Sequence, residues 1–222
     1  MQKSLDQPQN SNPSTAERIL TTARIHFSRK GYNGASIREI AREANISIAT
    51  LYYYAKNKDD LYRQVFENVY QEEIDTINSV LEKADENITS NPATLREFIF
   101  NLMDALIDRS SKDPDLIRLW AQRWIDKPEQ SDYIDKQYSA PLYKMIESII
   151  EKAEANGIIN PDLKNISLVL HSFTWLHYSF FSMGRLTYGV QVDDPYDPRQ
   201  LEDFREYIRI FVSRMLRFSD QN

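Results

Sequence analysis

A run of hydroxyl-bearing, small and aromatic side chains near residue 50 has a composition suited to contacting DNA. Its members are Ser47, Ile48, Ala49, Thr50, Leu51, Tyr52, Tyr53 and Tyr54. Hydroxyl groups bond base edges and phosphates, and small or apolar side chains contact thymine methyl groups in the major groove. On a helix, three successive tyrosines cannot all face one core, so at least one points outward. A helical hairpin buried in a core is the alternative interpretation, and it accounts for Leu51 alone.

Two short helices are expected to position this run. Ser36 and Glu39 have capping-box spacing, and Ser47 is placed to cap the next helix. Asn45 lies between the helices and tolerates the positive φ of a sharp turn. Two short helices joined by a tight turn form a helix-turn-helix unit. Because free amides at helix starts hold phosphate, Ser36, Ser47 and Lys58 fit that role.

The distribution of charge points the same way, although the formal net charge of the chain is −6. Between Thr15 and Lys58 there are eight basic and three acidic residues, which leaves 19 basic and 30 acidic residues elsewhere. Such asymmetry indicates a small basic module on an acidic body. Solvated helix faces that differ in charge by chance are the alternative.

The remainder of the chain is expected to be helical. Residues 1–14 are polar and lack an apolar period, which predicts a disordered tail. A capping box at Ser14 and Glu17 begins a helix that Gly31 is placed to end. Later helices are predicted to start at Asn57 and at four Asn-Pro or Asp-Pro pairs, and another to close at Asn156-Gly157. Those pairs are Asn91-Pro92, Asp113-Pro114, Asn160-Pro161 and Asp197-Pro198.

These signals predict an all-α fold of about nine helices without strands. A three-helix DNA-binding domain is expected over residues 15–60 and a helical regulatory and dimerisation domain over residues 61–222. The segment from Thr187 to Asp197 is expected to be a loop between the last two helices.

Several classes of function are disfavoured. The chain has no cysteine, which excludes disulfides, thiolate zinc sites and a cysteine nucleophile. Its three histidines are not in a metal-ligating helix motif, and neither a phosphate-cradling glycine loop nor a hydrolase serine elbow is present. We therefore expect no enzyme activity, no metal and no cofactor. No signal peptide is visible and the stretch from Leu168 to Met183 is interrupted by polar residues, so a cytoplasmic location is expected.

Residues 15–65 resemble the DNA-binding domain of the tetracycline-repressor (TetR) family. The matching elements are Arg18-Ile19-Leu20, Phe27, Gly31-Tyr32, Ser36-Ile37, Ile40-Ala41, Ala44, Ile46-Ser47, Thr50-Leu51-Tyr52-Tyr53, Lys58 and Leu61. The resemblance implies a helix-turn-helix head and a larger helical domain that binds a small molecule and forms a homodimer. Most members of the family are repressors that leave DNA when ligand binds. The chain departs from the family pattern at four positions. It has Asn45 where the family usually has Gly and Ala55 where the family usually has Phe, and Ile48 and Tyr54 also differ from the usual residues.

The resemblance also implies roles for individual residues. The predicted base contacts are Ser47, Ile48, Ala49, Thr50 and Tyr52. The predicted phosphate contacts are Ser36, Arg38, Tyr53 and Lys58, with Arg38 equally explained as a solvated charge.

In the C-terminal domain, the predicted ligand pocket consists of Phe98, Met103, Trp120, Trp124, Tyr138 and Tyr143. Each of these is also explained as ordinary core. Acidic residues near these aromatics, namely Glu97, Asp104 and Glu147, make a cationic lipophilic ligand conceivable beside a simply apolar one.

The predicted dimer interface consists of His171, Trp175, Tyr178, Phe204, Ile208, Phe211 and Met215, on the last two helices. A helix that is apolar almost all round must be buried on more than one side. Two subunits are also needed geometrically, because recognition helices meet successive major grooves about 34–36 Å apart.

Together these features predict a ligand-responsive regulator that binds a palindromic operator in double-stranded DNA as a homodimer. A small apolar or aromatic effector is expected to release it by favouring a head separation that no longer fits both half-sites. The alternative is a helical small-molecule-binding or interaction protein whose helix-turn-helix does not read DNA.

Overall fold

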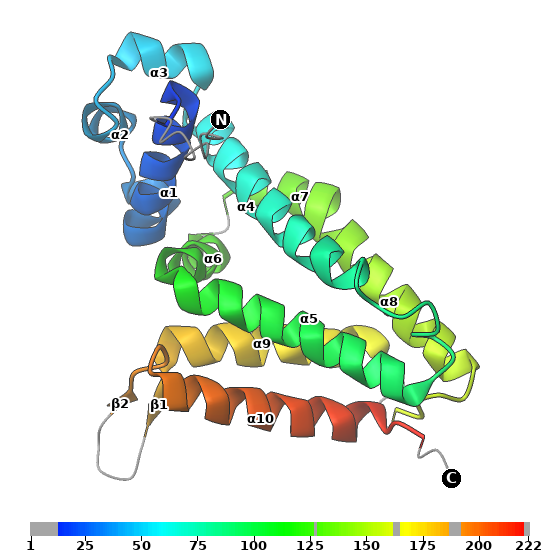
Figure 1. The fold of residues 1–222 in the computed structure, drawn as a ribbon. Helices are drawn as coiled ribbons and strands as arrows, with labels where there is room; N and C mark the ends of the chain where they lie inside the picture. The colour runs from blue at the N-terminus through cyan, green and yellow to red at the C-terminus, as the bar shows by residue number, and fades with distance from the viewer. Residues whose placement is uncertain (1–12, 127, 162–164, 187–191, 220–222) are drawn as a thin grey trace, which may run out of the picture.

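The computed structural model describes residues 13–126, 128–161, 165–186 and 192–219, and over these ranges it is almost entirely helical (Figure 1). The N-terminal elements are α1 (Thr15–Gly34), α2 (Ile37–Glu43), α3 (Ile48–Tyr54) and α4 (Lys58–Leu81). The central elements are α5 (Pro92–Lys112), α6 (Pro114–Asp126), α7 (Gln130–Ile134), a π-helical segment η1 (Asp135–Ser139) and α8 (Ala140–Ala155). The C-terminal elements are α9 (Ile166–Met183), β1 (Arg185–Leu186), β2 (Val192–Asp193) and α10 (Pro198–Leu216). The all-α prediction is confirmed.

One of the two predicted capping boxes forms. Ser14 accepts a hydrogen bond from the Glu17 amide at 3.2 Å, and Glu17 accepts one from the Ser14 amide at 2.7 Å. The box at Ser36 and Glu39 is wrong, since Ser36 makes no side-chain cap. The physical reason is competition, because Lys30 on α1 holds the Glu39 carboxylate at 2.6 Å.

Two backbone positions that the sequence marked as turns have positive φ. Asn45 has φ 55°, which makes the tight turn between α2 and α3. Gly31 has φ 67° and ψ 179°, a conformation nearly restricted to glycine. It kinks α1 instead of ending it, and one further turn carries the helix to Gly34.

The remaining caps follow the sequence with one exception. The side chains of Asn57, Asn91 and Asp197 accept amide hydrogen bonds at the starts of α4, α5 and α10, and Asp113 does so at α6. The start predicted at Asn160-Pro161 is wrong, because α9 begins at Ile166 with Asn165 as its cap. The Asn160 amide instead bonds carbonyls at the end of α10.

The fold differs from the prediction in two other places. The single helix expected before Asn156 is α8, and it is preceded without a break by η1 and by the short helix α7. With α7 counted separately, the described ranges contain ten α-helices. The expected loop from Thr187 to Asp197 contains β2, paired antiparallel with β1, while residues 187–191 lie outside the described residues. Nearly all of the predicted tail, residues 1–12, also lies outside them.

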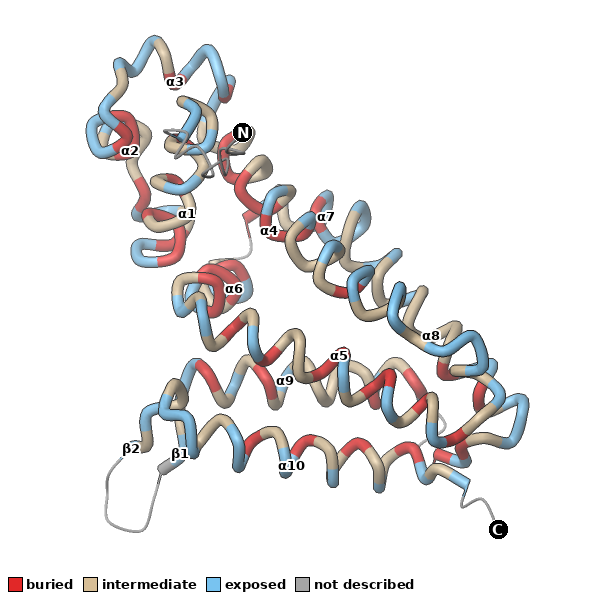
Figure 2. Tube along the Cα trace, in the orientation of Figure 1, coloured by how far each residue is buried: buried red, intermediate tan, exposed pale blue. Residues whose placement is uncertain are grey.

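The buried residues, red in Figure 2, form two side-chain clusters, and the division between these clusters does not coincide with the predicted domain boundary along the chain. The first joins α1 to α4 but also takes in Leu116, Leu119 and Trp120 of α6. The second lies among α5, α8, α9 and α10. The predicted boundary at residue 60 falls inside α4, whose 24 residues run from the N-terminal head into the helical body. The head therefore rests on α6 and shares a core with it.

Candidate DNA interface and ligand cavity

Helix α3 presents its polar and aromatic face to solvent. Leu51 is fully buried and anchors the helix, while Ile48, Tyr52 and Tyr53 are 41%, 50% and 85% exposed. Burying one residue of a seven-residue helix leaves the rest available to a partner. The prediction that the three tyrosines do not share one core is confirmed, since Tyr54 is exposed as well.

The start of α3 is fixed by two hydroxyl groups. Ser47 Oγ accepts a hydrogen bond from the Thr50 amide at 2.9 Å and lies 2.8 Å from Thr50 Oγ1. These contacts hold the first turn of the helix. They also occupy some of the hydrogen-bonding positions of the two hydroxyl groups that were predicted to contact bases. Ala49 is exposed beside them and presents a methyl group.

The four predicted phosphate contacts have different surroundings. Ser36 lies at the start of α2 with its hydroxyl not used as a cap, and Arg38 and Tyr53 are exposed. Lys58 is half-buried. Its ammonium group donates to the Asn33 carbonyl at 3.3 Å and lies 4.7 Å from the centre of the Tyr32 ring. Burial lowers the pKa of Lys58, and the residue thus also ties the start of α4 to the end of α1.

A buried histidine in the head was assigned no role from the sequence. His26 of α1 is 4% exposed, and its Nε2 lies 2.8 Å from a Glu43 carboxylate oxygen on α2. The nearby carboxylate of Glu39 is 4.0 Å from Nδ1. This contact sets α2 against α1, and the sequence signal was only an isolated histidine on an apolar helix face.

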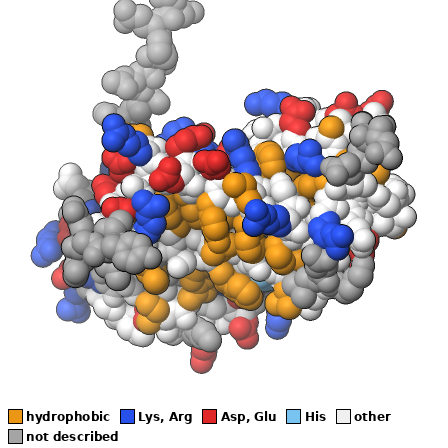
Figure 3. Space-filling view, turned by 90° about the horizontal axis from the view of Figure 1, so that it is seen from below, with side chains coloured by type: hydrophobic (Ala, Val, Ile, Leu, Met, Phe, Trp, Pro, Cys, Tyr) orange, Lys and Arg blue, Asp and Glu red, His pale blue; other side chains and the backbone are white. Residues whose placement is uncertain are grey.

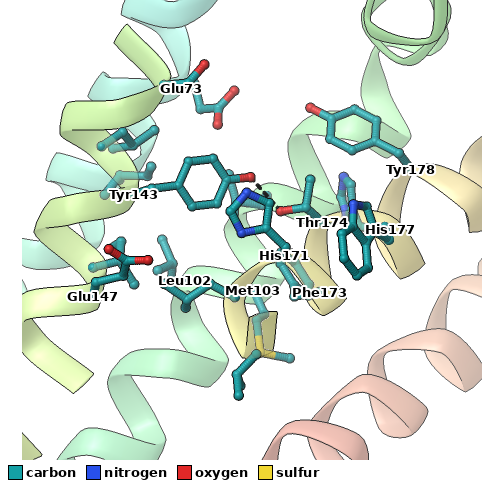
Figure 4. A pocket seen from close by; sticks show the side chains of 18 of the residues that line it. Glu73, Leu102, Met103, Tyr143, Glu147, His171, Phe173, Thr174, His177 and Tyr178 are labelled. Carbon is teal, nitrogen blue, oxygen red and sulfur yellow. Dashed lines mark hydrogen bonds between the residues drawn. The ribbon is translucent and has the colours of Figure 1, made fainter. Parts of the chain in front are cut away.

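The helical body contains a cavity of about 860 Å³ between α4, α5, α6, α8 and α9 (Figure 4). Five of the six predicted pocket residues line it, namely Phe98, Met103, Trp120, Trp124 and Tyr143. The structure does not place Tyr138 among the lining residues. It lies on η1, where its ring stacks on Tyr70 with centroids 5.3 Å apart.

Three residues predicted at the dimer interface also line this cavity. They are His171, Trp175 and Tyr178 of α9. His171 stacks on Tyr143 of α8 with centroids 4.5 Å apart, and Tyr178 meets Trp124 of α6 edge-on at 4.8 Å. Of the three, Trp175 alone is strongly exposed, at 57%. Helix α9 thus turns much of its aromatic surface inward, and its period alone did not distinguish a cavity wall from an interface.

Polar groups are few in the cavity and most of them are paired. Tyr143 Oη lies 2.8 Å from Thr174 Oγ1, and Ser110 Oγ lies 2.8 Å from His177 Nε2. Burial lowers the pKa of His177 to about 3, so its imidazole is neutral near pH 7. Burial raises the pKa of the Glu73 carboxyl, whose nearest ion-pair partner is Arg109 at 3.8 Å.

The predicted dimer residues of α10 are only partly available. Phe204 and Ile208 are buried within their own chain, and Phe204 stacks on Phe180 with centroids 4.0 Å apart. Helix α10 packs this side of itself on α9 and α5, so these two residues leave little surface for a second subunit. Phe211 and Met215 are half-buried.

The outer face of α9 and α10 nevertheless carries an apolar patch (Figure 3). Large apolar side chains that are strongly exposed on these two helices are Leu168, Trp175 and Met183 of α9 and Tyr207 and Ile210 of α10. Exposed apolar surface of this kind marks interaction sites in soluble proteins.

Helix α6 links the cavity to the head. Trp120 and Trp124 face the cavity, while Asp126 at the end of the same helix accepts the Tyr32 amide at 2.6 Å. Close packing at Gly31 leaves no room for a side chain, since a Cβ there would lie 2.4 Å from an Asp126 oxygen. Helix α6 therefore contacts both the cavity and the end of α1.

Within the described ranges no group of three or more His, Asp or Glu side chains is arranged to hold a metal ion. Nor is any helix there both long and apolar enough to cross a lipid bilayer.

Comparison with known proteins identifies the head. Residues 19–65 match the sequence profile of the bacterial regulatory proteins of the tetR family. The N-terminal head is therefore similar to the DNA-binding region of the TetR family. The chain is 32% identical over 96 residues to the negative transcriptional regulator IcaR of the icaADBC biofilm operon from Staphylococcus epidermidis. It is 33% identical over 92 residues to YttP, a probable helix-turn-helix transcriptional regulator from Bacillus subtilis.

The curated relatives match only part of this chain. The alignments cover 43% and 40% of the chain, and the chain spans 49% of IcaR and 42% of YttP. Solved structures extend the likeness to the whole fold. The regulator KstR2 of Mycobacterium tuberculosis has a TM-score of 0.66 at 18% identity, covering 93% of this chain and 97% of its own. GusR of Salmonella enterica has a TM-score of 0.67 at 16% identity, covering 94% and 99%.

Proposed function

We propose that this protein is a TetR-family transcriptional repressor that binds a palindromic operator as a homodimer and is released by a small molecule in the α4–α9 cavity. The observation that carries the proposal is the exposed face of α3. A seven-residue helix held by a single buried leucine leaves Ile48, Thr50, Tyr52 and Tyr53 accessible on a head with excess positive charge. No requirement of packing explains 85% exposure of a tyrosine.

Contacts to phosphate and to bases are assigned separately. Ser36, Arg38, Tyr53 and Lys58 are proposed to bind phosphates, which makes affinity fall with salt. Ser47, Ile48, Ala49, Thr50 and Tyr52 are proposed to face base edges. Because Ser47 and Thr50 already bond one another, their remaining acceptors and the Thr50 methyl group are what they offer to DNA.

The apolar patch on α9 and α10 supports the homodimer. A second copy placed there covers Leu168, Trp175, Tyr207 and Ile210, which otherwise expose large apolar surfaces to water. Pairing through helices of the body leaves both heads free, and each α3 then meets its own half-site.

The position of α6 supports the proposed release by ligand. A ligand that contacts Trp120 and Trp124 acts on the helix whose end holds Tyr32 and Gly31 of the head. The ligand shifts the equilibrium only through its differential affinity for the DNA-competent and released states.

The test is selection of sheared genomic DNA by the full chain at about 0.1 M salt, where screening acts beyond about 10 Å. Tyr52→Ala is the variant and Tyr133→Ala on α7 is the matched control, since the two tyrosines are 50% and 48% exposed. Enrichment of a short palindrome by the wild type and the control, but not by Tyr52→Ala, supports the proposal. Equal enrichment by all three proteins refutes the role of Tyr52 in base contact, and no enrichment by the wild type favours a small-molecule-binding protein that does not read DNA.

A further inference from the structure

The uncompensated charge of the cavity is negative. Three carboxyl groups and two guanidinium groups line it. Both guanidinium groups are already engaged. Arg109 donates to the Val69 carbonyl at 3.0 Å and to Glu72 at 3.1 Å, and Arg123 donates to the Ser131 carbonyl at 3.1 Å and to Asp135 at 2.5 Å. An anionic ligand would have to break these pairs.

The carboxyl groups that remain are Glu73 of α4 and Glu147 of α8. Glu73 has Arg109 at 3.8 Å as its ion-pair partner, and that guanidinium bonds Glu72 more closely. Glu73 and Glu147 lie on the same side of the cavity with Tyr143 between them (Figure 4). A half-buried carboxylate in a cavity wall with so little compensation favours a positively charged or strongly donating partner.

The rest of the wall is suited to a cation with apolar groups. The rings of Trp124, Tyr143, Trp175 and Tyr178 line the same space, and aromatic faces attract organic cations. The volume of about 860 Å³ lies within the range of about 300–1,000 Å³ typical of small-molecule sites.

We propose that the cavity binds a lipophilic organic cation, an amine or a quaternary onium ion, with its charge against Glu73 and its apolar groups among the rings. This inference deepens the proposed function, and it depends on that function only for the claim that occupancy changes DNA binding.

The chain provides its own reporter for the test. It has three tryptophans, Trp120, Trp124 and Trp175, and all of them line the cavity. Tetraphenylphosphonium and tetraphenylborate have the same shape and opposite charge, so a titration of tryptophan fluorescence with each isolates the effect of charge. We expect the phosphonium ion to bind the full chain at least about tenfold more tightly than the borate ion.

Glu73→Gln is the decisive variant, and Glu97→Gln, an exposed carboxylate outside the cavity, is its matched control. Glu73→Gln is expected to weaken phosphonium binding about tenfold and to leave borate binding unchanged or tighter, while Glu97→Gln changes neither. Glu147→Gln provides a second reading if Glu73→Gln does not fold by circular dichroism. Equal binding of the two ions, or a variant series without effect, overturns the inference.

A parallel titration of the protein–DNA complex separates this inference from the proposed function. Phosphonium binding without DNA release supports the cavity chemistry and refutes release by ligand. DNA binding without phosphonium binding overturns the cavity chemistry and leaves the regulator intact. Release of DNA by phosphonium, weakened in Glu73→Gln, supports both.

Discussion

Replacing Gly31 with alanine tests the contact between the DNA-binding head and the helical body. Gly31 has φ 67° and ψ 179°, where a residue with a Cβ costs about 1–3 kcal/mol. The new Cβ would lie 2.4 Å from Asp126 Oδ2 and 3.0 Å from Gln122 Oε1, both on α6. The Asp126 carboxylate must move, and it then releases the Tyr32 amide that it accepts at 2.6 Å.

The expected loss combines two effects. Hydrogen bonds to charged groups contribute about 1.5–3 kcal/mol, which added to the backbone strain gives about 2.5–6 kcal/mol for Gly31→Ala. A typical free energy of unfolding is about 5–15 kcal/mol, so the substitution removes a large part of the stability. DNA binding should weaken with it, because the end of α1 no longer rests on α6.

Two other glycines supply matched controls. Gly157 has φ 72°, and a Cβ added there would have no neighbour within 4 Å, so Gly157→Ala should lose about 1–2 kcal/mol from strain alone. Gly34 has no positive φ and meets only Lys30 Cβ at 3.3 Å, so Gly34→Ala should stay within about 1 kcal/mol of wild type. Urea unfolding followed by circular dichroism at one protein concentration measures all three. Equal losses for Gly31→Ala and Gly157→Ala would refute the argument that α6 packs against Gly31.

Three further predictions concern a buried histidine, the DNA contacts and the cavity carboxylate. Burial lowers the pKa of His177 to about 3, so the unfolded chain gains a proton below about pH 6.5 that the folded chain does not; the free energy of unfolding should fall by about 2 kcal/mol from pH 7 to pH 5, and His177→Gln should flatten this part of the urea profile. Thr50→Val should cost about 1–3 kcal/mol of discrimination between operator and scrambled DNA, whereas Tyr53→Ala should weaken both alike in fluorescence anisotropy, and the reverse pattern would exchange their roles. Burial raises the pKa of Glu73 in the free protein, and the titratable groups around this carboxyl are Arg109, Glu72, Tyr70, Tyr143 and Tyr178. The affinity for tetraphenylphosphonium should therefore rise with pH up to the pKa of Glu73 and then level off. A Glu73→Gln variant with a pH profile of the same shape would contradict the assignment of this pH dependence to Glu73.

Features that depend on neighbouring residues were predictable from the sequence. The turn at Asn45 and the caps at Asn57, Asn91 and Asp197 each follow from residues within four positions of one another. The failed cap at Ser36 shows the limit of local reasoning. Its partner Glu39 is held by a lysine nine residues earlier, a contact that exists only after α1 and α2 have packed.

The side of a helix that faces another element was much harder to predict. Helix α9 is apolar over most of its circumference, so its period does not say whether His171 and Tyr178 face a cavity or a second subunit. In the structure both line the cavity, and Phe204 is buried within its own chain. A cavity was expected from the family resemblance, and five of the six aromatic or Met residues named for it line it. Glu73 was missed because it is one of many charged residues along α4. Its neighbours in the sequence do not indicate that it lines a cavity.

The core that α6 shares with α1 to α4 restricts how this protein can be re-engineered or diversified by recombination. A chimaera that replaces residues 13–57 with the head of a relative would place foreign side chains against Leu116, Leu119 and Trp120. The graft would also need a glycine opposite Asp126. Heads are therefore exchangeable only together with a compatible α6, and because Trp120 also lines the cavity, a change of operator specificity by domain shuffling alters the ligand site as well.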